Sequence, residues 1–329
     1  MGLVRLLLPL PRAAARLVPE RGGALLGASL LHCVTPSWVA LRPPTAARRL
    51  AWAEEAVAVY STGSDKDADG LSRALALRSY ALLLSERYAE AGEAADASLA
   101  VPDARPSSAL TAFTVHLRAQ ALAGAGRIDE AIIAAGECVE LYRQSPAPER
   151  RERALGNLPA ALRTYGLVLG VGGRTQESVA VYEECAALLA AMSLRELAHV
   201  ELVRPRVLAE LVGGLRVLER YEDALGLGSE AREALRGPIA WSVPGIVLPL
   251  RVRLLVDLAH CHRATGDPVE ARACAEEAVG DARKLPTGSG LPEALDCLAG
   301  IFGELGDSER ESTLRRELAD LDMVGGAAP

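Results

Sequence analysis

The sequence predicts an all-α protein, an α-solenoid built from antiparallel helix pairs. Strong helix formers dominate the 329 residues, whereas aromatic residues, on which β-sandwiches and barrels draw heavily, make up only 4%. A helix, turn and helix pattern also recurs six times, at intervals of 40 to 47 residues. In such an array each helix pair buries its apolar face against the next pair, so one continuous body forms without a single central core.

Residues 1–43 form an apolar, basic N-terminal segment that the sequence leaves poorly defined. Pro9 and Pro11 interrupt its apolar run and Arg12 follows at once, whereas a secretory signal needs about 7 to 15 uninterrupted apolar residues. No stretch of the chain supplies the roughly 20 consecutive apolar residues of a transmembrane helix. We therefore expect a cytoplasmic protein without stable membrane insertion.

The helical array is predicted over residues 44–321, followed by a flexible tail at 322–329. A leading helix is expected at 45–60, after two prolines, because apolar residues recur there at helical spacing. The second helices of the six pairs begin with similar segments, at 87–99, 127–139, 174–186, 220–235, 267–279 and 307–318. Asp267 and Pro268 predict the start of the fifth of these helices, and a capping box from Ser308 to Glu311 predicts the start of the sixth.

Alignment of these segments places equivalent residues, called here the anchors, at Ala91, Ala131, Ser178, Ala224, Ala271 and Glu311. Twelve residues before the anchors lie Ser79, Ala119, Gly166, Val212, Ala259 and Ala299, and five residues before them glycine occurs at Gly126, Gly173, Gly266 and Gly306. Small side chains let two helices approach closely, and glycine supplies the left-handed conformation that ends the first helix. Val212 and Glu311 depart from the pattern.

This pattern resembles the tetratricopeptide repeat family over roughly residues 45–321. The matching features are Ala119, Gly126, Glu130, Ala131 and Cys138 in the second repeat, and Ala259, Gly266, Glu270, Ala271 and Ala278 in the fifth. The spacing exceeds the usual period of about 34 residues, so the chain is similar to the variants with longer repeats. The resemblance implies a right-handed superhelix whose atypical last repeat caps the stack.

No residue of the chain is predicted to be catalytic. The segment 170–175 has an arginine where a phosphate-binding loop needs lysine, and no strand precedes it, so it is interpreted as a turn between helices. Ser289 lacks the G-x-S-x-G pattern of a nucleophile elbow. The net charge of −7, from 36 basic and 43 acidic residues, argues against a basic nucleic-acid binder. We therefore expect a protein that is not an enzyme and does not bind nucleic acid directly.

Metal binding and cofactor binding are not predicted either. His260, Cys261 and His262 are adjacent in a helix, where successive side chains turn by about 100° and cannot share one ion. The six cysteines show no C-x-x-C motif and no framework spacing, so they are interpreted as reduced, buried residues.

The first helices of the pairs are expected to line a concave groove. Side chains that face it should lie 18, 15, 11 and 8 residues before each anchor; we call these the inner-face positions. They supply the candidate binding residues Arg73, Tyr80, His116, Gln120, Arg163, Arg206, Arg216, Arg253, His260 and Arg263. Arginine forks suit carboxylates, phosphates or an acidic peptide. The alternative is that these arginines pair with neighbouring glutamates or reflect the arginine-rich composition.

These observations favour a noncatalytic adaptor or regulatory module that binds an acidic or amphipathic peptide segment of a protein partner in its groove. Some tetratricopeptide proteins clamp a partner's acidic tail in this way, although the asparagines of the best-known clamp have no counterpart at the inner-face positions. Two alternatives remain open. The chain could be the ligand- or peptide-sensing module of a bacterial signalling or transcriptional regulator, or a scaffold that self-assembles into a homo-oligomer through its N-terminal segment.

Overall fold

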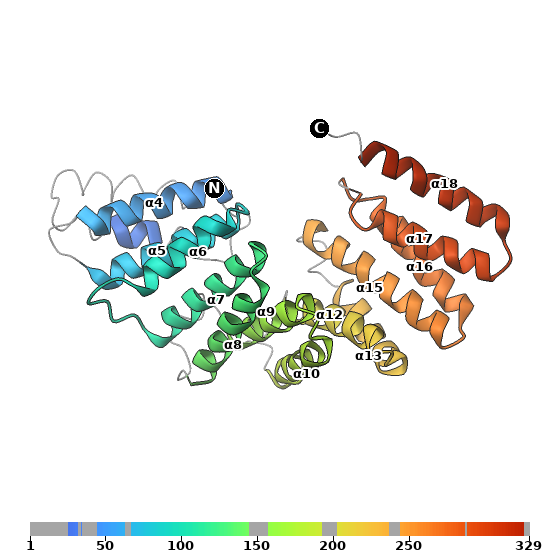
Figure 1. Ribbon diagram of the computed structural model, residues 1–329, viewed down its shortest axis with the longest axis horizontal. Coiled ribbons are helices and arrows are strands. Elements are labelled where there is room, and N and C mark those ends of the chain that lie inside the picture. The colour runs from blue at the N-terminus through green and yellow to red at the C-terminus, as the bar shows by residue number, and fades with distance from the viewer. Residues whose placement is uncertain are drawn as a thin grey trace. The chain divides into compact units, whose positions relative to one another are not determined.

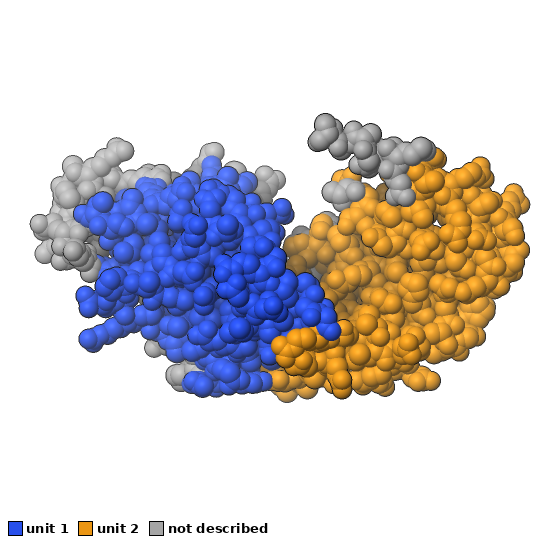
Figure 2. Space-filling model, viewed as in Figure 1, with its two compact units in different colours: residues 1–173 blue, residues 174–329 orange. Residues whose placement is uncertain are grey.

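The computed structural model describes residues 26–31, 34, 45–62, 67–144, 157–192, 203–236, 244–286 and 288–325. Within these ranges the regular secondary structure is helical throughout, which confirms the predicted fold class. The chain divides into two compact units, Met1–Gly173 and Arg174–Pro329 (Figure 2). Most of the predicted N-terminal segment and the last four residues of the predicted tail lie outside the described residues.

The first unit contains the leading helix and the helices that follow it along the chain (Figure 1). They are α4 (Ala46–Thr62), α5 (Ala68–Leu83), α6 (Tyr88–Leu99), α7 (Ser108–Gly124), α8 (Ile128–Gln144) and α9 (Leu158–Val171). Each helix packs against the next one, and the first helices α5, α7 and α9 also contact one another in that order. The leading helix predicted at 45–60 is α4, and it packs against α5.

The second unit repeats this arrangement (Figure 1). Its helices are α10 (Thr175–Ala191), α12 (Val203–Val217), α13 (Tyr221–Ala234), α15 (Pro244–Ala264), α16 (Pro268–Ala282), α17 (Leu291–Glu304) and α18 (Ser308–Gly325). The helices α12 and α13, α15 and α16, and α17 and α18 form pairs, and the first helices α12, α15 and α17 contact one another in that order.

All six predicted turns have the same backbone conformation. Gly126, Gly173 and Gly266 have φ angles of 77°, 76° and 80°, and Gly306 has 75°. The two turns without glycine are equally left-handed: the residue five positions before Ala91 is Glu86 (φ 57°), and the one before Ala224 is Glu219 (φ 59°). The predicted repeat register is therefore confirmed at every turn, including the two where the glycine signal is missing. Segment 170–175 spans the end of α9, this turn and the start of α10, as predicted.

The small residues lie at the helix contacts, as the alignment predicted. Ala119 and Ala259 in the first helices and the anchors Ala131 and Ala271 are completely buried. Glu311, the exceptional anchor, is half-buried because the facing residue of α17 is glycine. A Cβ atom at Gly303 would lie only 2.9 Å from the Glu311 carboxylate, so the missing side chain makes room for the longer one.

The residue four positions before each anchor lies just before the second helix of the pair, and it is either arginine or aspartate. Where this residue is arginine, its guanidinium pairs with the acidic residue three positions later, as Arg127 does with Glu130 at 2.6 Å. Where it is aspartate, the carboxylate accepts a hydrogen bond from a backbone N–H group of the first turn, as at Asp267. Asp307 caps α18 in the same way, so the capping box predicted from Ser308 is wrong by one residue.

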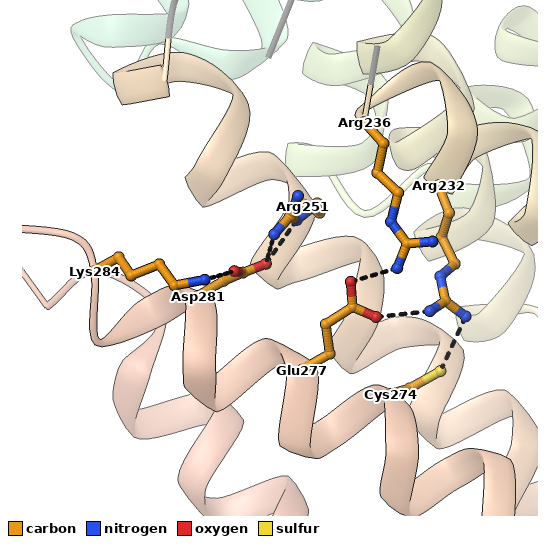
Figure 3. A network of polar contacts seen from close by, with 7 residues as sticks. All are labelled: Arg232, Arg236, Arg251, Cys274, Glu277, Asp281 and Lys284. Atoms are coloured by element: carbon orange, nitrogen blue, oxygen red, sulfur yellow. Dashed lines mark hydrogen bonds and ion pairs between the residues drawn. The ribbon is translucent and has the colours of Figure 1, made fainter. Parts of the chain in front are cut away.

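A buried carboxylate ties α16 to the neighbouring helix α15 (Figure 3). The Asp281 side chain is only 2% exposed, and it accepts hydrogen bonds from Arg251 Nε at 2.6 Å and Lys284 Nζ at 2.9 Å. Burial by itself raises the pKa of Asp281, but these hydrogen bonds and charges outweigh it and hold the pKa below its usual value. The ionised form is therefore the one that the folded protein favours.

A second carboxylate on the same helix binds two arginines from the preceding pair (Figure 3). Glu277 accepts hydrogen bonds at 2.6 Å from Arg232 on α13 and from Arg236 just beyond that helix. The Arg232 guanidinium also lies 3.9 Å from the Cys274 sulfur. The two carboxylates thus connect α16 with both α13 and α15, so charged groups as well as apolar packing join these helices.

Candidate functional site

In the first unit the inner-face positions lie on the adjacent helices α5, α7 and α9. Tyr80 is half-buried; its ring lies under the Arg49 guanidinium, 5.8 Å away, and 6.4 Å from the ring of Phe113. Burial raises the pKa of the Tyr80 hydroxyl, and the positive charge of Arg49 partly opposes this. Arg73 is half-buried on the same helix. This part of the face therefore combines aromatic rings with cationic groups.

Three further candidate residues meet where α7 contacts α9. His116 is 7% exposed, and its Nε2 atom lies 2.8 Å from the hydroxyl oxygen of Thr164 and 2.9 Å from the amide nitrogen of Gln120. Burial, helped by the nearby charge of Arg163, lowers the pKa of His116 to about 4. The imidazole is therefore neutral near pH 7, and its Nε2 lone pair accepts a hydrogen bond from Gln120.

In the second unit the inner-face arginines are held by carboxylates on neighbouring helices. Arg216 on α12 donates to Asp257 on α15 at 2.6 Å, and Arg253 on α15 pairs with Glu210 on α12 at 2.5 Å. Arg263 on α15 pairs with Glu304 at the end of α17. The alternative drawn from the sequence, that these arginines pair with acidic neighbours, thus describes Arg216, Arg253 and Arg263. Arg206 lies half-buried on α12.

These ion pairs differ in their surroundings. The Asp257 side chain is 9% exposed, and burial raises its pKa although Arg216 opposes this. Arg253 keeps half of its side-chain surface exposed. A guanidinium carries five N–H donors, so one ion pair leaves further donors for a ligand.

His260 lies half-buried between the charged groups of α15. Burial lowers its pKa, and the positive charges of Arg216 and Arg263 add to this effect. Near pH 7 the imidazole is therefore neutral, so the candidate cations of the second unit are its four arginines.

The sequence interpretation missed the partners that hold these side chains. Thr164, Glu210 and Asp257 all lie 14 residues before an anchor, one position away from an inner-face position. A usable signal exists at two of them, because Glu210 and Asp257 follow Arg206 and Arg253 at i+4, on the same helix face. The pairing itself joins residues more than 40 positions apart, as for Arg253 and Glu210, so helix periodicity could not reveal it.

Within the described ranges, no three or more His, Cys, Asp and Glu side chains are grouped so that they could hold a metal ion. None of the helices in those ranges has both the length and the apolar character needed to cross a membrane. The five cysteines described, including Cys261 and Cys297, are free thiols and buried; burial raises the pKa of both of these thiols to about 11.

Neither a protein-family model nor a curated protein matches the sequence. Solved structures do match. The apo form of RapI superposes with a TM-score of 0.66 at 13% identity, over 90% of this chain and 77% of RapI. NprR in complex with its cognate peptide NprX gives a TM-score of 0.52 at 11% identity, over 89% of this chain and 75% of NprR.

A signal transduction ATPase with a tetratricopeptide repeat sensor, from Pyrococcus horikoshii, gives a TM-score of 0.58 at 14% identity. The match covers 97% of this chain and 47% of the ATPase. At such identities the likeness concerns the fold. Together with the repeat register, it shows that this chain is a helical repeat protein with the tetratricopeptide-like fold.

Proposed function

We propose that this protein is a noncatalytic adaptor or regulatory module whose first-helix faces bind a peptide segment. The observation that carries the proposal is the set of partly exposed guanidinium groups on these helices. Arg253 is half exposed, and its ion pair with Glu210 fixes the side chain without using all of its donors. A cation that is already ordered loses less side-chain entropy when it binds a ligand, which favours recognition of acidic residues.

The likeness to NprR supports a peptide as the partner. NprR was crystallised with its cognate peptide, and it shares the fold of this chain over most of its length. Fold alone does not determine function, so the proposal depends on the side chains of this chain and on the test below.

The test is selection from a displayed library of random decapeptides, followed by affinity measurement for the enriched sequences. We expect the protein to enrich peptides rich in Asp and Glu. The Arg206→Glu/Arg253→Glu variant should bind them at least about tenfold more weakly, because each lost charge-assisted contact contributes about 1.5 to 3 kcal/mol. No enrichment, or equal binding by the variant, would contradict the proposal.

Because Arg253 forms an ion pair with Glu210, its replacement needs a control variant that keeps this ion pair. Reversal of Arg253 alone places two carboxylates together, which destabilises the helix contact for reasons unrelated to peptide binding. The exchange variant Glu210→Arg/Arg253→Glu keeps the ion pair and moves its cationic end to α12. This variant and the native protein should have the same helical content and melting temperature. If their peptide affinities nevertheless differ, the difference results from peptide recognition and not from a loss of stability.

A second candidate function is the sensor of a signalling or transcriptional regulator. The likeness to the signal transduction ATPase favours it, because that protein carries a tetratricopeptide repeat sensor and the match covers 97% of this chain. A short peptide or small molecule that raises the melting temperature in the absence of any protein partner would support the sensor, because a ligand that binds only the folded state stabilises it by mass action. The third candidate is self-assembly through residues 1–43. It predicts that deletion of this segment lowers the number of protein copies per particle in solution.

A further inference from the structure

Part of the N-terminal segment is packed into the core of the first unit. Residues 26–31 are helical and lie beside α4 (Figure 1). Four apolar side chains of this stretch are buried in one cluster with side chains of α4 and α5; they are Leu26, Leu30, Leu31 and Val34. We call residues 26–31 together with Val34 the strap.

Two contacts show that the strap runs antiparallel to α4. Near the end of α4, the Tyr60 ring occupies the space beside Gly27, where a Cβ atom would lie only 2.6 Å from Tyr60 Cζ. Near the start of α4, Arg49 Nη1 donates a hydrogen bond to the carbonyl oxygen of Val34 at 2.6 Å. The strap and α4 are therefore arranged like the first and second helices of a repeat pair.

Arg49 stands at the anchor position of this pair. The five residues buried from Arg49 to Ala56 on α4 have the same spacing as the five buried from Ala131 to Cys138 on α8. The Thr45 hydroxyl, four positions before Arg49, accepts a hydrogen bond at 3.3 Å from the backbone of the first turn, as the aspartates do in the fifth and sixth pairs. The repeat therefore continues one pair further toward the N-terminus, where arginine replaces the small anchor.

This anchor holds its pair differently from the small ones. Arg49 is only 5% exposed, and within the described residues its guanidinium contacts the Val34 carbonyl and the Tyr80 ring but no carboxylate. A buried cation without a paired anion is costly, and one charge-assisted hydrogen bond offsets only part of that cost. A helix as short as the strap is also unstable by itself. Its attachment therefore requires less free energy to break than the contacts between the longer helices.

We propose that the strap and α4 form a seventh helix pair that caps the first unit, and that the strap, fastened by Arg49, opens while α5 to α9 stay folded. Opening uncovers the apolar side of α4, which includes Trp52 and Ala56. The strap thereby controls whether this apolar face is available. The inference is independent of peptide binding, and it gives the strap a partner within its own chain rather than in a second copy.

Hydrogen exchange of the full-length protein tests whether the strap opens separately. The exchange is measured in increasing urea, at concentrations below the unfolding transition. We expect the strap amides to exchange through an opening that depends weakly on urea, because it exposes little surface, and the α7 amides to show a steeper dependence. A single rate and slope for both regions, or a strap without protection, would overturn the proposal.

Two substitutions loosen the strap at its opposite ends. Gly27→Ala places a methyl group against the Tyr60 ring, which cannot move away because Gly70 lies against its other side. Arg49→Met keeps the length of the side chain but leaves the Val34 carbonyl without its donor. Each variant should accelerate exchange of the strap at least about tenfold, as expected for the loss of a charge-assisted hydrogen bond or a comparable clash. Exchange in α7 to α9 should stay nearly unchanged.

Matched controls carry the same substitutions at exposed positions. Gly226 on α13 has open space around its Cβ position, so Gly226→Ala should leave exchange of the strap unchanged. Arg48 is the exposed neighbour of Arg49, and Arg48→Met should change it little. Equal strap exchange in the variants and their controls would overturn the proposal. Equal acceleration in the strap and in α7 to α9 would also overturn it, because it would show one cooperative core.

Dye binding tests what the opening uncovers. The dye 1-anilinonaphthalene-8-sulfonate binds exposed apolar surface. Gly27→Ala should bind more of it than the native protein and Gly226→Ala do, with nearly the same helical content. If the strap exchanges faster but dye binding does not rise, the strap does not control access to an apolar face.

Discussion

At the scale of single residues, the turns show how one backbone conformation is imposed on different side chains. Four of the six turns use glycine, whereas Glu86 and Glu219 adopt the same left-handed conformation with a Cβ atom present. That conformation costs about 1 to 2 kcal/mol in a residue other than glycine, because Cβ approaches the following carbonyl oxygen. The packing of the two flanking helices must supply this energy.

Replacement of Glu86 or Glu219 by glycine should therefore stabilise the protein. Relief of the steric cost exceeds the added entropy of the unfolded chain, which is about 0.4 to 1 kcal/mol, so we expect a net gain of about 0.5 to 1 kcal/mol for each change. The measurement is the midpoint of urea unfolding. Glu93→Gly, the same substitution at an exposed position inside α6, should lower the midpoint. A lower midpoint for Glu86→Gly would contradict the explanation.

At the scale of helices, charged groups as well as small residues decide how one helix binds the next. Ala119 and Ala259 permit close approach, and their positions follow from the repeat. The network on α16 does not follow from it, because the partners of Glu277 and Asp281, Arg232 and Arg251, lie on the other helices α13 and α15 (Figure 3). A buried ion pair of this kind fixes the register of two helices, since loss of one partner leaves the other charge unpaired.

Asp281→Asn should lower the free energy of unfolding by about 3 kcal/mol at pH 7. The folded-state pKa of Asp281 lies below its usual value, so its ionised form contributes stability above about pH 4, and this is lost as the pH falls through the folded-state pKa. The difference between the variant and the native protein should therefore shrink between about pH 5 and pH 2 in urea titrations. Asp96→Asn, which removes a surface ion pair with Arg118, should cost less than about 1 kcal/mol. A constant difference at every pH would contradict this assignment.

At the scale of the whole molecule, stability is distributed along the chain. Within each unit, each helix packs mainly against its neighbours in sequence, and the contacts group into two compact units, Met1–Gly173 and Arg174–Pro329. In such a protein, stability approximates a sum of local terms, so damage in one region spreads only through its neighbours. A globular protein with one central core would lose protection everywhere at once.

Ala119→Leu tests this locality. The completely buried Ala119 leaves no room for a larger side chain, so overpacking should cost about 1 to 3 kcal/mol. Hydrogen exchange should accelerate in α5 to α9 and change much less in α15 to α18. Ala51→Leu, at an exposed position of α4, serves as the control and should leave exchange unchanged. Equal acceleration in both units would show a single cooperative core instead.

The helix pairs, the small anchors and the turns could be predicted from the sequence because each depends on residues close together in the chain. Local spacing placed Gly126 at a turn and Ala131 at a helix contact, and the structure confirms both. The start of α18 was misplaced by one residue, because Asp307 and Ser308 are both good N-cap residues and only the backbone geometry distinguishes them.

The sequence by itself determined the helix-pair repeat, because helical periodicity and glycine conformations act locally, and it predicted which side chains occupy the inner-face positions. Only the tertiary structure decided the electrostatic state of those side chains. It paired Arg253 with Glu210 and Arg216 with Asp257 across more than 40 residues, and it buried His116 beside Arg163. The physical reason is that charge pairing and desolvation depend on which helices touch. The i+4 spacing of Arg253 and Asp257 indicates a shared helix face, but it does not identify the partner on the neighbouring helix.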